Sequence, residues 1–385
     1  MHLPRFTGTA LLALIALAAS ACGSSGGASS TTTQAGSATS SGANRLGPAY
    51  DTTTAAAVTL NGAGANSIDP FFEKVFYDYH QKNPKTTINY SPAGSSVGIK
   101  DIQEGTVDFG QTEIPMSATD LVGASAGPVL QVPVALGGVA ISYNVPGAPK
   151  NLKLDGPTLA GIFDGTITNW DDPEIASVSG VSNLPNLPIV AVHRADSSGP
   201  GWDLDAFLIK TAPAWVAKIG TTAPSKTWPL TSVGLGQQLN SGVATYIHQT
   251  AGAIGYVEYG YALQANFTNA ALKNASGSFV APSLRSIASS GSHATVLSAS
   301  NFSIIDEPGA GSYPLANFSW TLLDQTQSDE SKGVAAGKLF DYVVTTGQLQ
   351  AAGIGYAPLP QNVVDLAVTT LEKLKGPTGS LLFAP

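Results

Sequence analysis

The sequence predicts an α/β protein in which strands and helices alternate and the folded part forms two lobes. Short β-rich runs are each followed by a helical pattern, as where VTLNG precedes FFEKVFYDYHQK. In the second of these runs Phe71, Val75, Phe76 and Tyr79 recur at helical spacing and share one face. Such alternation favours largely parallel sheets covered by helices. About 330 residues follow the N-terminal region, too many for one ordinary core, so we expect two lobes.

Residues 1–21 have the layout of a secretory signal. Arg5 gives a basic start, residues 10–19 are apolar without interruption, and a small-residue trio, Ala-Ser-Ala, ends the segment. Ten apolar residues cannot cross a ~30 Å hydrocarbon core as a helix, so we expect a signal and not a membrane span. Cys22 follows, and this layout resembles the lipobox of bacterial lipoproteins, in which the cysteine is lipidated. An ordinary signal followed by an incidental cysteine is the alternative.

The composition of the next segment, residues 22–54, predicts a flexible linker that begins at the lipidated cysteine. Gly, Ser, Thr and Ala dominate it, with almost no charge, and such a stretch buries too little apolar area to offset the entropy of ordering it. About thirty flexible residues reach roughly 30 Å. Cys22 is the only cysteine, which excludes an internal disulfide. We expect folding to start near Ala55.

The remaining elements are predicted in chain order. The Gly/Ser-rich stretch around residues 274–300 is expected to form surface loops. The expected strands and the helices after them are 58–62 with 71–82, 88–93 with 98–105, then strands 107–115, 129–135 and 139–145, followed by 187–194 with 202–212 and 251–259 with 261–267.

Composition and charge exclude several classes of function. Lys and Arg number 18 against 26 Asp and Glu, which gives a net charge of −8 and no run of basic residues. This does not fit a nucleic-acid-binding surface. The five histidines form no H-E-x-x-H motif or close pair, and no Walker A lysine is present. A metal centre and a P-loop nucleotide site are therefore not expected.

Three strand-to-helix turns share one chemistry. Residues 60–67, 94–98 and 194–201 each place small or hydroxyl residues where a helix is expected to begin. The free N–H groups of a first helical turn, with the positive end of the helix dipole, favour an anion. Arg194 adds a planar cation suited to a tetrahedral oxyanion, and Asp196 could hold it in place. Taken singly, each turn could be ordinary helix capping.

A series of short motifs gives the whole sequence a specific resemblance to one protein family. In order along the chain they are GAGA at 62–65, GSS at 94–96, VDFG at 107–110, WDDPEIA at 170–176, RADSSG at 194–199, GAIGYVEY at 252–259 and FDYVVTTG at 340–347. Together they resemble the phosphate-binding proteins (PstS) of bacterial phosphate ABC transporters. The resemblance implies a type II periplasmic-binding-protein fold, with mixed sheets flanked by helices and the ligand in the cleft between the lobes. Its lobes would be residues 55–137 plus 308–385, and 138–307.

The same resemblance implies a function and its partners. The protein would be an extracytoplasmic lipoprotein, anchored to the cell membrane through Cys22, that captures inorganic phosphate. It would deliver the phosphate to the permease subunits and ATPase of an ABC transporter. A monomer without cofactor, metal or nucleic-acid partner is expected, and no enzymatic activity.

Matching the family motifs position by position gives the expected ligand residues. The sequence departs from the family at three of these positions. Asn66 replaces a Thr, Glu113 replaces the Asp that accepts the proton of hydrogen phosphate, and Pro200 replaces a Thr and so removes a hydroxyl and an N–H. The phosphate-binding residues are expected to be Asn66, Ser67, Ser95, Glu113, Arg194, Ser198 and Gly199, with Asp196 supporting Arg194.

Two other functions remain open from the residues. A lipoprotein of this kind could act as a phosphate or oxyanion sensor without transport. The G-x-S-x-G pattern at 94–98 also matches a nucleophile elbow, with Ser96 as the nucleophile of a serine hydrolase. The candidates for its base and orienting acid are His248 or His293, and Asp171, Asp172 or Asp196.

Overall fold

The computed structural model describes residues 45–47, 57–117, 120, 127–294 and 302–384. The predicted signal, Cys22 and most of the predicted linker lie outside these residues. Within the described part, no helix combines the length and the apolar character needed to cross a membrane. Residues 45–47 fall inside the predicted linker and contact the folded part. The Arg45 guanidinium lies 2.5 Å from Asp365 Oδ1, and the Arg45 backbone N–H donates to Asp341 Oδ1 at 3.1 Å.

One large mixed sheet runs through the folded part, in the order β2-β1-β3-β12-β4-β8-β6-β7, with β9 paired to β4. Strands β1, β2 and β3 are parallel, as are β6, β7 and β8, whereas β12 and β4 run antiparallel to their neighbours. The expectation of largely parallel sheets is therefore wrong at the centre. The strands are β1 Val58–Gly64, β2 Thr86–Ser91, β3 Phe109–Thr112, β4 Val129–Tyr143, β6 Val190–Arg194, β7 Leu235–Gln237, β8 Ala253–Glu258, β9 Thr268–Asn269 and β12 Ala316–Asp324.

A second, three-stranded sheet has the order β11-β10-β5. Its strands are β5 Lys153–Leu154, β10 Ala271–Lys273 and β11 Phe279–Val280. Strand β10 pairs parallel with β5 and antiparallel with β11.

Strand β4 is a single buried strand of 15 residues, where the sequence predicted two. Its first part pairs with β12 and its second part with β8, so the ladder continues through the two glycines that interrupt the apolar pattern. A Cβ at Gly137 would lie 2.2 Å from Glu258 Oε1. The glycines are therefore needed for close packing and do not break the strand.

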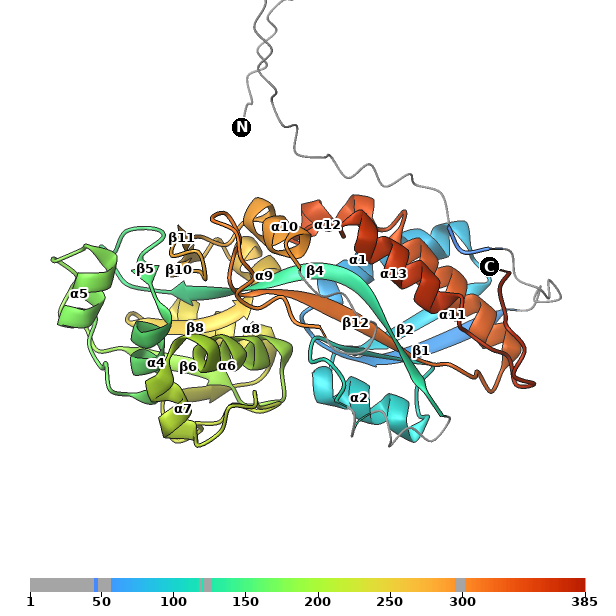
Figure 1. Ribbon diagram of the computed structural model, residues 1–385, viewed down its shortest axis with the longest axis horizontal. Helices are drawn as coiled ribbons and strands as arrows, with labels where there is room; N and C mark the ends of the chain where they lie inside the picture. Colours follow the sequence, from blue (N-terminus) through green and yellow to red (C-terminus); the bar gives the residue numbers. More distant parts are fainter. Residues whose placement is uncertain (1–44, 48–56, 118–119, 121–126, 295–301, 385) are drawn as a thin grey trace, which may run out of the picture. The chain divides into compact units, whose positions relative to one another are not determined.

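Helices cover both faces of the large sheet. Figure 1 shows α11 and α13 on one side of β1 and β12, and α2 on the other, with α4, α6 and α7 grouped near β6. The helices are α1 Asp69–Lys82, α2 Ser95–Glu104, α4 Gly156–Asp164, α5 Pro173–Ser179, α6 Gly199–Thr211, α7 Pro213–Ile219, α8 Leu239–Gln249, α9 Tyr259–Gln264, α10 Leu284–Ser292, α11 Glu330–Val344, α12 Gln348–Ile354 and α13 Gln361–Leu371.

Two helices test the sequence predictions directly. The predicted apolar face of α1 is buried, including Phe71, Val75, Phe76 and Tyr79. Helix α10 lies in the stretch predicted as surface loop, so that prediction is wrong there. A capping box supports this serine-rich helix, because the side chain of Ser283 accepts from the N–H of the third helical residue, whose own side chain bonds back.

Candidate functional site

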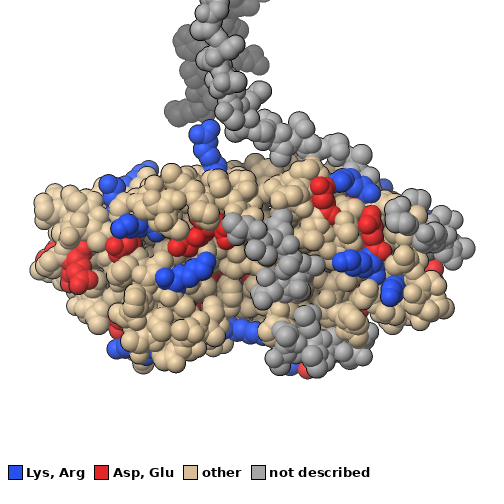
Figure 2. Space-filling model, in the orientation of Figure 1, with Lys and Arg blue, Asp and Glu red and all other residues tan. Residues whose placement is uncertain are grey.

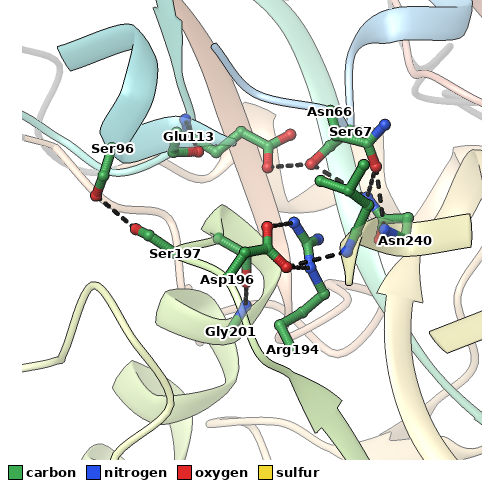
Figure 3. Close-up of polar contacts among 12 residues, drawn as sticks. Asn66, Ser67, Ser96, Glu113, Arg194, Asp196, Ser197, Gly201 and Asn240 are labelled. Atoms are coloured by element: carbon green, nitrogen blue, oxygen red, sulfur yellow. Dashed lines mark hydrogen bonds and ion pairs between the residues drawn. The ribbon is translucent and has the colours of Figure 1, made fainter. Parts of the chain in front are cut away.

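Arg194 ends β6 and is the charged centre of the candidate site. Its side chain is 2% exposed. Nε donates to Asp196 Oδ1 at 2.8 Å and Nη2 pairs with Asp196 Oδ2, so the ion pair expected from the sequence is present (Figure 3). The backbone N–H of Leu239 also donates to Asp196 Oδ1, at 3.0 Å. Nη1 is buried and has no hydrogen-bond partner among the described residues. The guanidinium is thus held firmly while one nitrogen keeps its donors unused.

The first turn of α6 lies just after Arg194 in the chain. Ser198 is the N-cap, and its Oγ accepts from the N–H of Gly201 at 3.0 Å. Its hydroxyl proton stays available to a further acceptor. Gly199 begins the helix and packs against Glu113, because a Cβ there would lie 2.3 Å from both Cβ and Oε2 of that glutamate. Only a residue without a side chain allows this approach.

Glu113 follows β3 and is buried, with 2% of its surface exposed. Its Oε2 accepts from Ser67 Oγ at 2.5 Å and its Oε1 from Ser319 Oγ at 3.0 Å. Burial raises the pKa of this carboxyl to about 7, although the two hydroxyl donors and the charge of Arg194 lower it. The site therefore contains a carboxyl that exchanges a proton near neutral pH.

Ser95 and Ser96 begin α2, opposite the turn that carries Arg194. Ser95 is buried and its Oγ accepts from the Glu113 N–H at 3.3 Å. Ser96 Oγ lies 2.5 Å from Ser197 Oγ, and a Cβ at Gly94 would lie 2.9 Å from the Ser197 carbonyl oxygen. The N-terminal turns of α2 and α6 therefore meet, as Figure 3 shows for the two serines.

Asn66 lies between β1 and α1 and links that turn to α8 and α9. Its Oδ1 accepts from the N–H and Nδ2 of Asn240, at 3.0 and 3.3 Å, and its Nδ2 donates to the Tyr261 hydroxyl at 3.2 Å. One of its two amide hydrogens is therefore already used, and one is left for a ligand.

The structure thus brings the expected residues together in two linked groups. Ser67, Ser95 and Glu113 share hydrogen bonds, and Arg194 with Asp196 lies beside the Ser198–Gly199 turn that contacts Glu113. The sequence interpretation missed Asn240, Tyr261 and Ser319, which all lie outside the motifs used to predict the site. Asn240 and Tyr261 are in the first turns of α8 and α9, after β7 and β8, and Ser319 is on β12. Within the described ranges, no three His, Cys, Asp or Glu side chains are arranged to hold a metal ion.

Three of the residues named for a hydrolase, Ser96, His293 and Asp172, are engaged elsewhere. Ser96 bonds to a serine, and no hydrogen bond in the described part of the chain joins it to a histidine. His293 Nδ1 contacts the Ser289 carbonyl oxygen at 2.7 Å, and Asp172 caps α5.

Comparisons with known proteins agree on the family. A family model described as a PBP superfamily domain matches residues 29–346. The phosphate-binding protein PstS of Xylella fastidiosa (strain Temecula1) is 36% identical over 310 residues, which is 80% of this chain and 83% of that protein. The protein of the same name from Pasteurella multocida is 35% identical over 81% of this chain and 89% of its own length.

Solved structures support the same fold. A subatomic-resolution structure of a high-affinity periplasmic phosphate-binding protein has a TM-score of 0.64 at 20% identity, over 81% of this chain and 93% of the other. A phosphate-binding protein from Stenotrophomonas maltophilia has a TM-score of 0.62 at 18% identity, over 81% and 94%. The chain therefore has the type II periplasmic-binding-protein fold expected from its motifs and belongs to the PstS family of phosphate-binding proteins.

Proposed function

We propose that this protein captures inorganic phosphate outside the cytoplasm and delivers it to the permease and ATPase of an ABC transporter. The observation that carries the proposal is Nη1 of Arg194, a buried charged donor beside a helix N-terminus that has no partner in the part of the chain the structure describes. A buried donor without an acceptor costs about 1–3 kcal/mol, and more when it is charged. An oxyanion bound at this point would remove that cost.

The local arrangement, and not the net charge, would attract the anion. The face drawn in Figure 2 carries scattered charges of both signs on a chain whose net charge is −8. The guanidinium, the first turn of α6 and the Ser95 and Ser198 hydroxyls would supply the donors in a buried setting, where each counts for more than in water. Ser67 donates its hydroxyl proton to Glu113 and would offer its backbone N–H instead. Asn66 would add an amide hydrogen.

Glu113 would distinguish phosphate from sulfate. Its carboxylate would accept the proton that a phosphate oxygen carries and a sulfate oxygen does not. A site built around a hydrogen bond that the competing ligand cannot make rejects that ligand strongly. The Thr-to-Pro change at Pro200 removes donors and lowers the expected affinity by roughly tenfold to a hundredfold if nothing compensates.

The proposed lobes, residues 55–137 plus 308–385 and 138–307, would close over the ligand by a hinge movement. Contacts that join segments assigned to different lobes support a closed arrangement. They are the hydrogen bonds of Ser96 to Ser197 and of Asn66 to Asn240, and the ion pair of Asp120 with Lys226 at 2.7 Å.

Membrane attachment would come from a lipid on Cys22 after cleavage of the 1–21 signal, with residues 23–54 as a tether and a monomeric binding domain. Expression of a Cys22→Ser variant tests this. The variant protein should move from the membrane fraction to the soluble extracytoplasmic fraction. Unchanged membrane association would overturn the anchoring proposal.

Calorimetric titration of the chain without residues 1–21, carrying Cys22→Ser, tests phosphate binding. We expect one phosphate per chain with micromolar or tighter affinity. Absence of heat, together with absence of thermal stabilisation by phosphate, would refute the proposal. Binding without any loss of cellular phosphate uptake on deletion of the protein would favour a sensor over a transport component.

A further inference from the structure

Three carboxyl groups are buried together at the candidate site. Glu113 follows β3, Asp203 lies on α6 and Glu258 ends β8. Asn317 on β12 lies between two of them. Its Nδ2 donates to Asp203 Oδ2 at 2.7 Å, and its Oδ1 lies near Glu258, since a Cβ at Gly137 would meet both side chains within 3.0 Å. A cavity of about 10 Å³ is lined by both Glu113 and Asp203. It holds about one water molecule at most, so the carboxyls are almost without solvent.

No described cation forms an ion pair with any of the three. The nearest guanidinium, that of Arg194, is committed to Asp196 through two of its nitrogens. Among the described residues, the donors to the Glu113 carboxyl are the neutral hydroxyls of Ser67 and Ser319. A carboxylate buried without a counter-charge is so costly that the group takes up a proton instead.

The other two carboxyls hold their protons more tightly than an exposed acid does. Burial, reinforced by the neighbouring Glu113, raises the pKa of both Asp203 and Glu258 well above the usual range. Glu258 Oε2 and Asn317 Oδ1 are both buried acceptors without a partner in the described residues. A proton on Glu258 Oε2 turns this oxygen into a hydrogen-bond donor. Asn317 Oδ1 is an acceptor that needs such a donor.

Glu113 is the carboxyl that titrates near neutral pH. Burial raises its pKa to about 7, and Arg194 is the one charged group acting against that rise. The tyrosines that face it have raised pKa values and stay uncharged. The titratable and charged groups around Glu113 are Arg194 on β6, Asp203 on α6, Glu258 on β8, Tyr90 on β2, Tyr261 on α9 and Tyr356 after α12.

We propose that the choice of this site between phosphate and sulfate changes with pH, because Glu113 is a buried acid whose hydrogen-bond donors are the neutral hydroxyls of Ser67 and Ser319. The inference rests on the proposed phosphate-binding function. One proton must lie between Glu113 and the facing ligand oxygen. Ionised Glu113 with HPO₄²⁻, ionised Glu113 with H₂PO₄⁻ and neutral Glu113 with sulfate each provide that proton. Ionised Glu113 with sulfate does not, because neither partner carries a proton.

The pH dependence of sulfate binding follows from the need for this shared proton. Sulfate binds only the form with neutral Glu113, so its apparent dissociation constant rises as that form is lost. With a pKa of about 7, the neutral fraction falls about a hundredfold between pH 6 and pH 9, and sulfate affinity falls by the same factor. Phosphate supplies the proton itself when Glu113 is ionised, so its affinity changes much less.

Titration of the full mature chain with sodium sulfate and with sodium phosphate, at half-unit steps from pH 5.5 to pH 9, tests the inference. We expect sulfate binding at pH 6 that weakens about tenfold per unit above pH 7. Glu113→Gln keeps a neutral donor and should bind sulfate with one affinity throughout. Asp203→Asn is the matched control, since it replaces the neighbouring buried carboxyl, leaves Glu113 and its two hydroxyl donors in place and should keep the wild-type profile.

The outcomes separate the two proposals. Phosphate binding with no sulfate binding at pH 5.5, or with sulfate affinity independent of pH, would overturn this inference and leave the proposed function standing. A shifted profile in Asp203→Asn would show that the carboxyls titrate as a pair and would also overturn it. Failure of phosphate to bind at every pH would refute both proposals. The wild-type profile decides the matter even if Glu113→Gln fails to fold.

Discussion

Replacing Gly199 by alanine should weaken phosphate binding without unfolding the protein. The added Cβ would lie 2.3 Å from both Cβ and Oε2 of Glu113, well inside the closest approach of real side chains. Overpacking of this kind costs about 1–3 kcal/mol. Gly199 and Glu113 belong to different proposed lobes, so opening relieves the clash. The cost therefore falls on the closed, ligand-bound state and corresponds to about fivefold to 150-fold in affinity.

Calorimetry with phosphate and thermal melting of the ligand-free protein measure these two effects separately. Gly353→Ala is the matched control, because a Cβ there meets nothing within 4 Å. This variant should keep the wild-type affinity and have a slightly higher melting temperature, because alanine has a higher helix propensity than glycine. Wild-type phosphate affinity in Gly199→Ala would refute the reasoning. So would a large drop in melting temperature with unchanged affinity, since the clash would then belong to the folded core.

Three further predictions use other groups. Arg194→Ala should weaken phosphate binding more than a hundredfold, because it removes the buried cation and leaves Asp196 without its partner; an unchanged dissociation constant would remove Arg194 from the site. Ser96→Ala should alter phosphate affinity by less than about tenfold, since one hydroxyl contact is worth about 0.5–1.5 kcal/mol, whereas ester turnover that this change abolishes would revive the hydrolase interpretation. Burial raises the pKa of Asp324 to about 6 in the folded protein. Protonation of this side chain therefore contributes to the free energy of unfolding in full below about pH 4, and the contribution is lost as the pH rises through 6. Asp324→Asn should therefore stabilise the protein by about 1 kcal/mol at pH 8, after allowing for its partial exposure, and by nothing at pH 4 in urea unfolding; equal effects at both pH values would contradict this.

The parts of the site set by local sequence could be predicted. Arg194 and Asp196 are two residues apart at a strand end, and their side chains meet whatever the rest of the fold does. Helix starts at Ser95 and Gly199 follow from small and hydroxyl residues after a strand. These features need only a short stretch of chain.

The parts set by distant chain segments could not be predicted. Asn240 bonds Asn66 from 174 residues away, and Ser319 bonds Glu113 from 206 residues away. Neither lies in a motif, because one side chain on a helix or strand carries no pattern of its own. The continuity of β4 was missed for the same reason, since its pairing partners β12 and β8, and not its own residues, keep it extended across the two glycines.

The family resemblance implies an Asp at position 113, and the structure gives a physical account of the Glu that stands there. The extra methylene group needs space, and Gly199 leaves that space by having no side chain. The extra methylene group also lets the Glu113 carboxyl reach two hydroxyls, those of Ser67 in the β1–α1 turn and Ser319 on β12. Both donors are neutral, and the Arg194 guanidinium is directed to Asp196. The longer acid is thus well hydrogen-bonded but poorly neutralised, and this combination places its proton exchange in the pH range where phosphate itself changes charge.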